Sequence, residues 1–339
     1  MNIPTLQTQY SKINNLLYIS YLPKVINAAI DINLFEIFSG SSLTLDNIVE
    51  KLNTQKNVTG ALLKVLTEIG LVAKEDDKYC LTGLSEEYLV RTSEATQLYE
   101  VKRFTGSAGP FDFLPQVLKG QMPEFDGKMW SSKEAALNME QGMKAGGLQS
   151  VVSFVKSIPE FSSCTDMCDL AGNIGYFSYA FLQENLNLTA HVYDLPAVCQ
   201  IAKDVKQNEK GFNRVTYHDF DMKKDESFGE GYDFFFISHF LYEYAANGTL
   251  GDFFRKVNRA MKPGGIFVSN HICDKALDKE NLLTLSLVEL QTRALGYPTH
   301  QLPESTLKAA LTEAGFGDFR IQQSDGSYAF PTLLLSAKK

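Results

Sequence analysis

Residues 166–175 read Asp-Met-Cys-Asp-Leu-Ala-Gly-Asn-Ile-Gly, and this stretch decides the fold. A short apolar run leads into Asp169, Gly172 and Gly175 follow three residues apart, and residues 176–184 have a helical pattern. This order predicts a strand, a tight turn and a helix. Glycine suits such a turn because it tolerates positive φ and lets a ligand approach the backbone closely.

A second acidic residue favours a nucleotide-type site at this turn. Asp194 ends the next apolar run, in the sequence His-Val-Tyr-Asp-Leu-Pro. An acid about 20 residues beyond a glycine turn is placed to accept hydrogen bonds from ribose hydroxyls. The alternative is an ordinary strand–helix turn, because a loose glycine pattern alone has low specificity.

Strands and helices alternate from residue 165 onward. Strands are predicted at 166–170, 190–193, 215–218, 232–237, 265–271, 319–322 and 332–336, and helices at 195–207, 249–261 and 304–314. This alternation predicts an α/β domain with a mostly parallel sheet that is covered on both faces. Ligands bind such sheets beyond the carboxyl ends of the strands. That edge would collect Asp169–Gly175, Asp194-Leu195, Asp219–Met222, Ser238-His239 and His271.

The N-terminal part has a different pattern. Residues 11–38 carry apolar residues at helical spacing with few charges, which predicts a helix whose several apolar sides a partner subunit could bury. Residues 42–52 and 59–69 predict two more helices, and residues 71–81 a hairpin. Three helices before a hairpin form a winged-helix arrangement. DNA readout is the familiar use of that arrangement, but this segment has little basic character.

Residues 85–160 are predicted to be mostly helical, and they are rich in aromatic residues and methionine. Such side chains could line a pocket for a flat apolar substrate, or could equally be simple core. The substrate-contacting candidates in this stretch are Phe104, Trp130, Met139 and Met143.

Composition limits the remaining classes of protein. The 339 residues carry a net charge of −8, which argues against sequence-independent binding of nucleic acid. We find no apolar run of transmembrane length and no signal segment at residues 1–10. The five cysteines form no CxxC pair and indicate reduced thiols in a cytoplasmic protein. No cluster of carboxylates and histidines has the spacing of metal ligands, so no metal is expected.

With these motifs in place, the chain resembles the S-adenosylmethionine-dependent O-methyltransferases of the caffeic-acid and hydroxyindole (acetylserotonin) type. The resemblance extends over nearly the whole chain and includes Leu34–Phe38, Leu66–Leu71, Tyr79–Leu89, Asp169–Gly175, Val192–Val198, Lys262–Gly265 and Ala314–Phe316. It implies a winged-helix dimerisation domain over residues 1–95, a helical linker over residues 96–160 that contributes to the substrate pocket, and a Rossmann-like class I methyltransferase domain over residues 161–339. It also implies a homodimer, a small aromatic substrate, and no nucleic-acid or membrane partner.

The resemblance assigns roles to the residues at the sheet edge. Asp169, Gly172, Asn173 and Gly175 would shape the methionine end of the S-adenosylmethionine site. Asp194 would bind the ribose hydroxyls and Leu195 would pack near adenine. Adenine would contact Asp221-Met222 or Asp219-Phe220, since the register is ambiguous, and Ser238 and His239 would lie beside the sulfonium.

Two departures from the family pattern stand out. The family's turn usually has glycine where this chain has Ala171 and Asn173. Family members that act on phenols also carry His-Asp-Trp after the fourth strand, and that histidine is the general base. Here Tyr242 stands at its position and Glu243 keeps an acid at the next one. Tyrosine, with an ordinary pKa of about 10, is a poor base at neutral pH.

Another residue would then have to accept the proton. His271 is the favoured candidate because it falls where the family has a second catalytic acid, and His239 and His300 are the others. Gln301 lies in the segment that the family uses to close over substrate. We therefore predict a methyltransferase that acts on a hydroxyl of a small aromatic or polyketide-like molecule. A cofactor-binding hydroxylase or decarboxylase and a non-catalytic binding protein are the alternatives.

Overall fold

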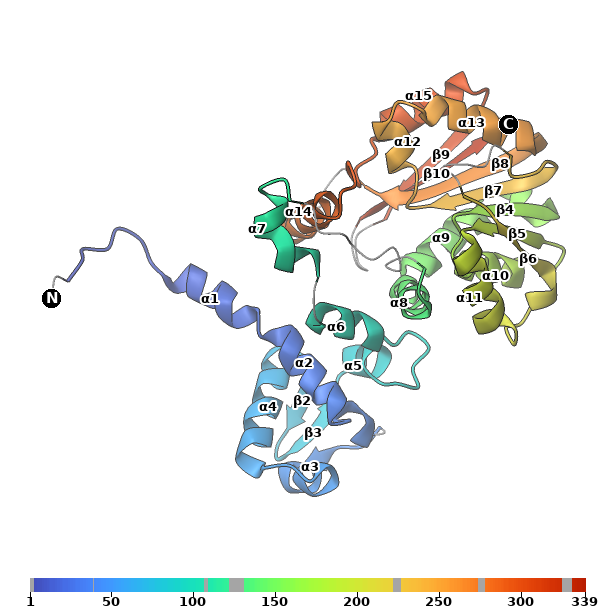
Figure 1. The fold of residues 1–339 in the computed structure, drawn as a ribbon. Helices are drawn as coiled ribbons and strands as arrows, with labels where there is room; N and C mark the ends of the chain where they lie inside the picture. The colour runs from blue at the N-terminus through green and yellow to red at the C-terminus, as the bar shows by residue number, and fades with distance from the viewer. Residues whose placement is uncertain are drawn as a thin grey trace. The chain divides into compact units, whose positions relative to one another are not determined.

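The computed structural model describes residues 3–38, 40–106, 109–121, 131–221, 227–273, 278–324 and 331–339. The chain divides into an N-terminal unit, Met1–Ser107, and a C-terminal unit, Ala108–Lys339 (Figure 1). Among the helices in the described ranges, none combines the length and apolar character that a bilayer crossing requires.

The N-terminal unit packs helices around a small antiparallel sheet. Its elements are α1 (Ser11–Ile19), α2 (Leu22–Asp31), η1 (Phe35–Ile37), β1 (Leu43–Thr44), α3 (Leu45–Leu52), α4 (Lys56–Glu68), β2 (Val72–Glu75), β3 (Lys78–Leu81), α5 (Gly83–Tyr88) and α6 (Leu98–Thr105). Strand β3 lies between β1 and β2. Helices α2, α3 and α4 followed by the β2–β3 hairpin form the predicted winged-helix arrangement.

The prediction of one helix within residues 11–38 was wrong. The chain forms α1 and α2 with a break at Ser20-Tyr21, and then the short helix η1. Pro23 explains the break, because a proline without an N–H group fits the first turn of a helix and not its interior. Helix α1 buries none of its residues, and Leu16, Leu17 and Tyr18 are more than half exposed.

The C-terminal unit is built on a seven-stranded sheet. Its elements before β7 are η2 (Pro110–Phe113), α7 (Leu114–Val117), α8 (Lys133–Lys144), α9 (Gly147–Lys156), η4 (Pro159–Ser163), β4 (Asp166–Leu170), α10 (Tyr176–Glu184), β5 (Thr189–Asp194), α11 (Pro196–Lys206), η5 (Phe212–Arg214) and β6 (Val215–Asp219). The remaining elements are β7 (Tyr232–Ser238), α12 (Tyr242–Ala246), α13 (Leu250–Ala260), β8 (Met261–Ile272), α14 (Lys279–Ala294), α15 (Glu304–Glu313), β9 (Gly317–Gln323) and β10 (Thr332–Lys338).

The strand order explains where a ligand would bind. The sheet runs β6-β5-β4-β7-β8-β10-β9, and the first five of these strands are parallel. Strand β10 is antiparallel and lies between β8 and β9. The order reverses between β4 and β7, so a crevice is expected beyond the carboxyl ends of these two strands. All seven predicted strands are present, which confirms the predicted sheet.

Two apolar cores cover the faces of this sheet. One packs α9, α10 and α11 against the sheet through side chains such as Phe154, Phe181 and Cys199. The other packs α12, α13 and α15 on the opposite face through side chains such as Phe254 and Leu307 (Figure 1). A sheet buried on both faces leaves its carboxyl edge as the place where polar side chains can gather.

Candidate active site

The turn after β4 wraps tightly around a buried carboxyl group. Asp169 is almost wholly buried, and the Ser178 hydroxyl donates a hydrogen bond to its Oδ2 at 2.7 Å. A Cβ atom at Gly172 would lie 2.6 Å from Cγ of Asp169. Glycine is therefore required at this position, because any side chain would collide with the carboxyl group.

Three residues of this turn adopt left-handed backbone. The φ angles are +55° at Ala171, +54° at Asn173 and +80° at Gly175. Asparagine tolerates this region well, whereas alanine pays a steric penalty there. The two positions at which the resemblance predicts glycine are thus left-handed here, although they hold alanine and asparagine.

Burial raises the pKa of Asp169 to about 7, and the nearby charge of Asp194 adds to this, against the opposing hydrogen bond from Ser178. A carboxyl group held by a hydroxyl in an apolar surrounding prefers to be neutral. A cationic group placed nearby would favour its ionised form. The loop therefore suits a ligand that brings positive charge to it.

Asp194, at the end of β5, accepts one backbone N–H group from this turn and one from the residue that follows it. Its Oδ2 accepts the N–H of Asn173 at 2.8 Å, and its Oδ1 accepts the N–H of Leu195 at 2.8 Å. Burial raises the pKa of Asp194, and these two N–H groups oppose the shift. Leu195 is 41% exposed beside it. The two hydrogen bonds leave lone pairs on both oxygens for ligand hydroxyls.

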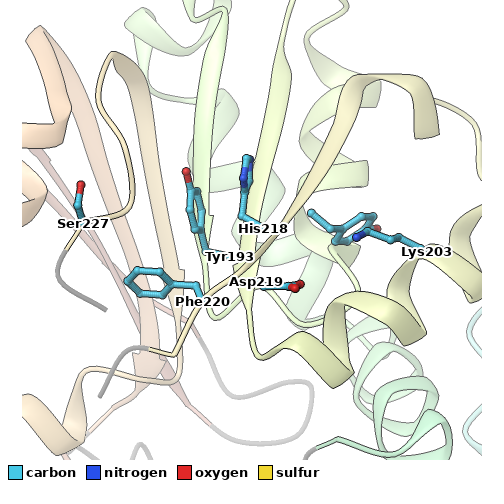
Figure 2. A pocket seen from close by; sticks show the side chains of 7 residues that line it. Tyr193, Lys203, His218, Asp219, Phe220 and Ser227 are labelled. Atoms are coloured by element: carbon cyan, nitrogen blue, oxygen red, sulfur yellow. The ribbon is translucent and has the colours of Figure 1, made fainter. Parts of the chain in front are cut away.

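The end of β6 lies next to this acid. The Phe220 N–H donates to the Asp194 carbonyl oxygen at 2.8 Å, and the Phe220 ring is buried. Asp219 and Phe220 point to opposite sides of the strand, and both line a cavity of about 530 Å³ that Lys203 and Ser227 also line (Figure 2). Asp221 is described, but the predicted contact at residue 222 lies outside the described residues.

His191 and His218 take part in packing at this end of the sheet. Nδ1 of His191 lies 2.9 Å from Nε2 of His218, and the His218 ring stacks on Tyr193 (Figure 2). Burial lowers the pKa of both histidines. These contacts give both rings a structural role in the packing at the end of the sheet.

The end of β7 is joined to β8 by polar contacts. The Asn270 side-chain amide donates to the Ser238 hydroxyl at 3.0 Å. The backbone N–H of His239 donates to the backbone carbonyl oxygen of Asn270 at 2.8 Å. His239 has a φ of +53°, which is uncommon for a residue with a side chain. Left-handed backbone at a strand end that meets a predicted ligand edge is typical of functional sites.

Three histidines surround the Tyr242 ring. Nδ1 of His239 lies 3.1 Å from the Tyr242 hydroxyl oxygen. The His300 ring stands edge-on to the Tyr242 ring at 4.9 Å between centroids, and the His271 ring at 6.5 Å. The structure therefore brings together four of the five predicted catalytic residues. The fifth, Glu243, lies next to Tyr242 in the first turn of α12.

Tyr242 and His239 have their polar atoms occupied. The Ile272 N–H donates to the Tyr242 hydroxyl oxygen at 2.8 Å, and Nε2 of His239 lies 3.3 Å from the Asn270 amide nitrogen. Burial raises the pKa of Tyr242 against the opposing Ile272 N–H group. Burial, with His300 and His271 nearby, lowers the pKa of His239 to about 3. At neutral pH both side chains are therefore uncharged.

His271 is the least satisfied polar side chain of the cluster. It is fully buried, and neither ring nitrogen has a hydrogen-bond partner among the described residues. Burial lowers its pKa to about 4, and the backbone carbonyl of Leu302, which lies near the ring but outside hydrogen-bonding geometry, opposes this shift. A buried polar group without a partner is rare and calls for an explanation, such as a ligand that the site binds.

His300 is held by α14. The ring Nδ1 of His300 is hydrogen-bonded to the Thr292 hydroxyl, and the backbone N–H of His300 donates to Oε2 of Glu289 at 3.0 Å. Burial lowers the pKa of His300, and the charge of Glu289 opposes the shift. The next residue, Gln301, is exposed.

The predicted substrate residues are spread over both units. Met139 and Met143 lie one turn apart on α8 of the C-terminal unit, and Sδ of Met139 is 3.8 Å from the Asn173 amide nitrogen. Phe104 belongs to α6 of the N-terminal unit, where the Arg103 guanidinium lies 4.5 Å from its ring centroid. Residue 130 lies outside the described residues.

Three polar residues of the site escaped the sequence analysis. Ser178 interrupts an apolar helix, Asn270 interrupts an apolar strand, and Glu289 lies on a helix that had not been predicted. A buried polar residue inside an apolar run is the signal that could have identified the first two. In the described part of the chain, no group of three or more histidine, cysteine or acidic side chains is arranged to hold a metal ion.

Comparison with known proteins identifies the class. Residues 121–317 match the O-methyltransferase domain, and residues 14–91 match the O-methyltransferase dimerisation domain. Since the first match alone covers more than half of the chain, the chain belongs to the O-methyltransferase family. It is by this membership an S-adenosylmethionine-dependent O-methyltransferase, which confirms the resemblance inferred from the sequence.

Individual relatives support this assignment. The chain is 25% identical to acetylserotonin O-methyltransferase of Bos taurus over 332 residues, which cover 90% of this chain and 92% of that protein. It is 28% identical over 253 residues to an uncharacterised protein of Methanocaldococcus jannaschii, with 72% of this chain and 65% of that protein covered. The crystal structure of human N-acetylserotonin methyltransferase in complex with S-adenosylmethionine has a TM-score of 0.74 at 20% identity, with 100% of this chain and 99% of that chain covered. This likeness supports the class I methyltransferase fold.

Proposed function

We propose that this protein transfers the methyl group of S-adenosylmethionine to a hydroxyl oxygen of a small aromatic or polyketide-like molecule in the cytoplasm. The observation that carries the proposal is the edge formed by β4, β5, β7 and β8, where a strained glycine turn and two oriented acids lie beside a polar cluster around Tyr242.

The residues at the cofactor end suit the parts of S-adenosylmethionine. The turn formed by Asp169, Gly172, Asn173 and Gly175 would hold the methionine end, where its cationic groups would meet the buried acid. The Asp194 carboxylate would accept the ribose hydroxyls, and Leu195 would pack near adenine. The adenine would contact Asp219-Phe220 or Asp221-Met222, and Ser238 and His239 would lie beside the sulfur. When bound, this cofactor supplies a methyl group on a sulfonium. The acceptor oxygen would take the methyl group in line, and the sulfur would leave as a thioether.

Among the described residues, the histidines of the acceptor end are weak bases. The ring nitrogens of His239 and His300 contact neutral groups, the Glu289 carboxylate accepts only the backbone N–H of His300, and burial lowers the pKa of all three histidines near Tyr242. Catalytic histidines are commonly made more basic by a carboxylate partner. His271 is the favoured proton acceptor because neither of its ring nitrogens forms a hydrogen bond with a described residue, and His239, His300, Tyr242 and Glu243 are the other candidates.

Weakly basic imidazoles favour a particular kind of acceptor. A base with a low pKa removes protons efficiently only from a hydroxyl that is itself acidic. We therefore propose that the acceptor hydroxyl ionises near or below neutral pH, as in hydroxyquinones, enolic acids and nitrophenols. The predicted pocket residues Phe104, Trp130, Met139, Met143 and Gln301 would contact its flat apolar part.

We also propose that the protein is a homodimer and that residues 1–95 form its dimerisation domain. Residues 96–160 would be the helical linker of the substrate pocket, and residues 161–339 the cofactor domain. The match to a dimerisation domain supports the dimer, and so does the exposed apolar surface of α1. A stable interface would bury these exposed apolar side chains.

Incubation with methyl-labelled S-adenosylmethionine tests the proposal. The acceptors are hydroxyquinones, nitrophenols and unsubstituted phenols, and the products are identified by mass spectrometry. We expect label on the oxygen of the acidic acceptors. Methylation of the unsubstituted phenols alone would contradict the proposed acidity, and no labelled product with any acceptor would contradict the proposed activity.

Tyr242 supports a second candidate. A family member with tyrosine in place of the catalytic histidine could bind the cofactor and carry out hydroxylation or decarboxylation instead. Consumption of an acceptor without transfer of label would favour this function. A non-catalytic binding protein is the third possibility, and it predicts cofactor binding without consumption of any acceptor.

A further inference from the structure

A buried ion pair joins α8 to α11. Nζ of Lys206, in the last turn of α11, lies 3.0 Å from Oε1 of Glu140 on α8. Lys206 is 4% exposed, and the Glu140 side chain is 12% exposed. Burial alone would raise the pKa of Glu140, but Lys206 and Lys144 more than offset this, so the pKa is lowered. The Glu140 carboxylate is thus ionised although little water reaches it.

Such a pair restricts where α8 can lie. A buried ammonium group needs its carboxylate nearby, because leaving one charge unpaired in the interior is strongly unfavourable. Lys206 also lies 3.4 Å from Oε2 of Glu209, and 5.4 Å from the centroid of the Tyr179 ring. The position of Lys206 is therefore set by α11, by Glu209 just beyond that helix and by Tyr179 of α10, and Glu140 of α8 lies against it.

From this anchor, α8 contacts the glycine turn directly. Met139 precedes Glu140 on the helix, and its Sδ is 3.8 Å from the Asn173 side-chain nitrogen. The N–H of the same Asn173 donates to Asp194, the proposed ribose ligand. A methionine side chain adapts its shape to the group it covers, which suits a contact that must accommodate a ligand.

A second chain of contacts leads from Lys206 to the same turn. The Tyr179 ring beneath Lys206 carries a hydroxyl that lies 3.1 Å from the Tyr217 hydroxyl. The Tyr217 hydroxyl in turn donates to the Ile174 carbonyl oxygen at 2.9 Å. Both routes therefore end on adjacent residues of the turn, Asn173 and Ile174.

We propose that α8 is a clamp over the cofactor turn, held in place by the buried pair of Glu140 and Lys206, and that this pair sets the affinity for S-adenosylmethionine and S-adenosylhomocysteine. The inference rests on the proposed cofactor site at residues 169–175. Glu140 and Lys206 are positioning residues, because they act on the turn through Met139 and Tyr179.

Binding of S-adenosylhomocysteine, measured by calorimetry at 20 °C, tests the clamp without knowledge of the acceptor. We expect Glu140→Gln to raise the Kd about tenfold, and Met139→Ala about fivefold, with both variants folded by circular dichroism. Both changes loosen the same helix. The increase in Kd of the double variant should therefore be clearly smaller than the product of the two single increases. The matched control is Glu160→Gln, which removes the exposed 2.9 Å pair with Lys338 and should leave the Kd unchanged.

The outcomes separate the clamp from a purely structural role. A folded Glu140→Gln variant with the wild-type Kd would overturn the clamp, even if its melting temperature fell. Fully multiplicative effects in the double variant would also overturn it, since the two residues would then act independently. A wild type that binds no S-adenosylhomocysteine would instead contradict the proposed function, and the clamp with it.

Discussion

The two ends of the proposed site are built in different ways. At the cofactor end, the N–H of Asn173 in one short turn and the N–H of Leu195 hold Asp194, and a serine from the following helix holds Asp169. At the acceptor end, histidines from three separate segments pack around Tyr242. The first end depends on local sequence and the second on tertiary packing. Substitutions at the cofactor end would therefore disturb one short segment, whereas a substitution at the acceptor end changes a single side chain of the cluster.

Replacing His271 is expected to have the largest effect. His271→Ala should lower kcat roughly 10²–10⁴-fold when the acceptor hydroxyl is still protonated at the assay pH, because a proton acceptor is lost from the acceptor end. On an acceptor whose hydroxyl is already ionised, the loss should be much smaller. Steady-state kinetics at saturating S-adenosylmethionine measures the change. His239→Ala and His300→Ala are the companion variants, since either could carry the role instead.

Tyr242→Phe is the matched comparison for His271→Ala. It keeps the ring and its packing, so we expect most of the activity to remain with some loss of stability from the unpaired Ile272 N–H. Near wild-type rates in all three histidine variants, together with an inactive Tyr242→Phe, would assign the acid–base role to tyrosine. The second candidate function would then gain support.

Asp169→Asn tests the electrostatics of the cofactor end. The pKa of Asp169 is raised to about 7, so the folded protein keeps a proton that the unfolded chain releases near pH 4. Stability conferred by this group is therefore present at low pH and is lost as the pH rises towards 7. The asparagine variant should be more stable than the wild type at pH 8, by on the order of 3 kcal/mol, and should differ little at pH 4.

Urea denaturation of Asp169→Asn at the two pH values measures this difference. Asp204→Asn, which changes an exposed acid on α11, is the control and should show no such pH dependence. An Asp169→Asn variant that is equally destabilised at both pH values would contradict the raised pKa.

Asp194→Ala should weaken binding of S-adenosylhomocysteine about 30-fold, because hydrogen bonds to a charged group contribute about 2 kcal/mol. Most of the ligand-induced rise in melting temperature should disappear as well. A full-sized rise in the variant would mean that the cofactor lies elsewhere. The acceptor end should be unaffected, so kcat at saturating cofactor should change much less than the KM for the cofactor.

Ala171→Gly should have the smallest effect. Alanine is strained at a φ of +55°, so glycine should raise the free energy of unfolding by up to about 1 kcal/mol. Thermal unfolding of the two proteins without ligand measures this. A destabilised glycine variant would mean that the Ala171 methyl group makes a packing contribution larger than its strain.

The sequence predicted the sheet better than the helices. Each strand showed as a short apolar run that ended at a polar residue, and all seven were found. Helix α14 was missed because its leucines lie on several sides of the helix and give no single apolar face, and Leu282, Leu283 and Leu287 remain exposed. The break within residues 11–38 was missed because Pro23 was not weighed against the apolar pattern.

The candidate site divides in the same way. The close approach at Gly172 and the hydrogen bonds of Asp194 involve residues that lie near one another in the chain or at the ends of adjacent strands, so pattern and spacing could indicate them. The cluster around Tyr242 joins residues from positions 239 to 300. Their proximity arises from the register of β7 against β8 and from the packing of α14, which spacing along the chain does not encode.

The position of β10 has a consequence for how the sheet assembles. Strand β9 pairs with β10, and β10 pairs with β8 across a register that joins Thr332 to Ile272. The earlier strand in the chain is therefore joined to the sheet only through the later one. Pairing between residues so far apart in sequence is slow to form. This side of the sheet should thus be completed late in folding, and disruption of β10 alone would detach two strands.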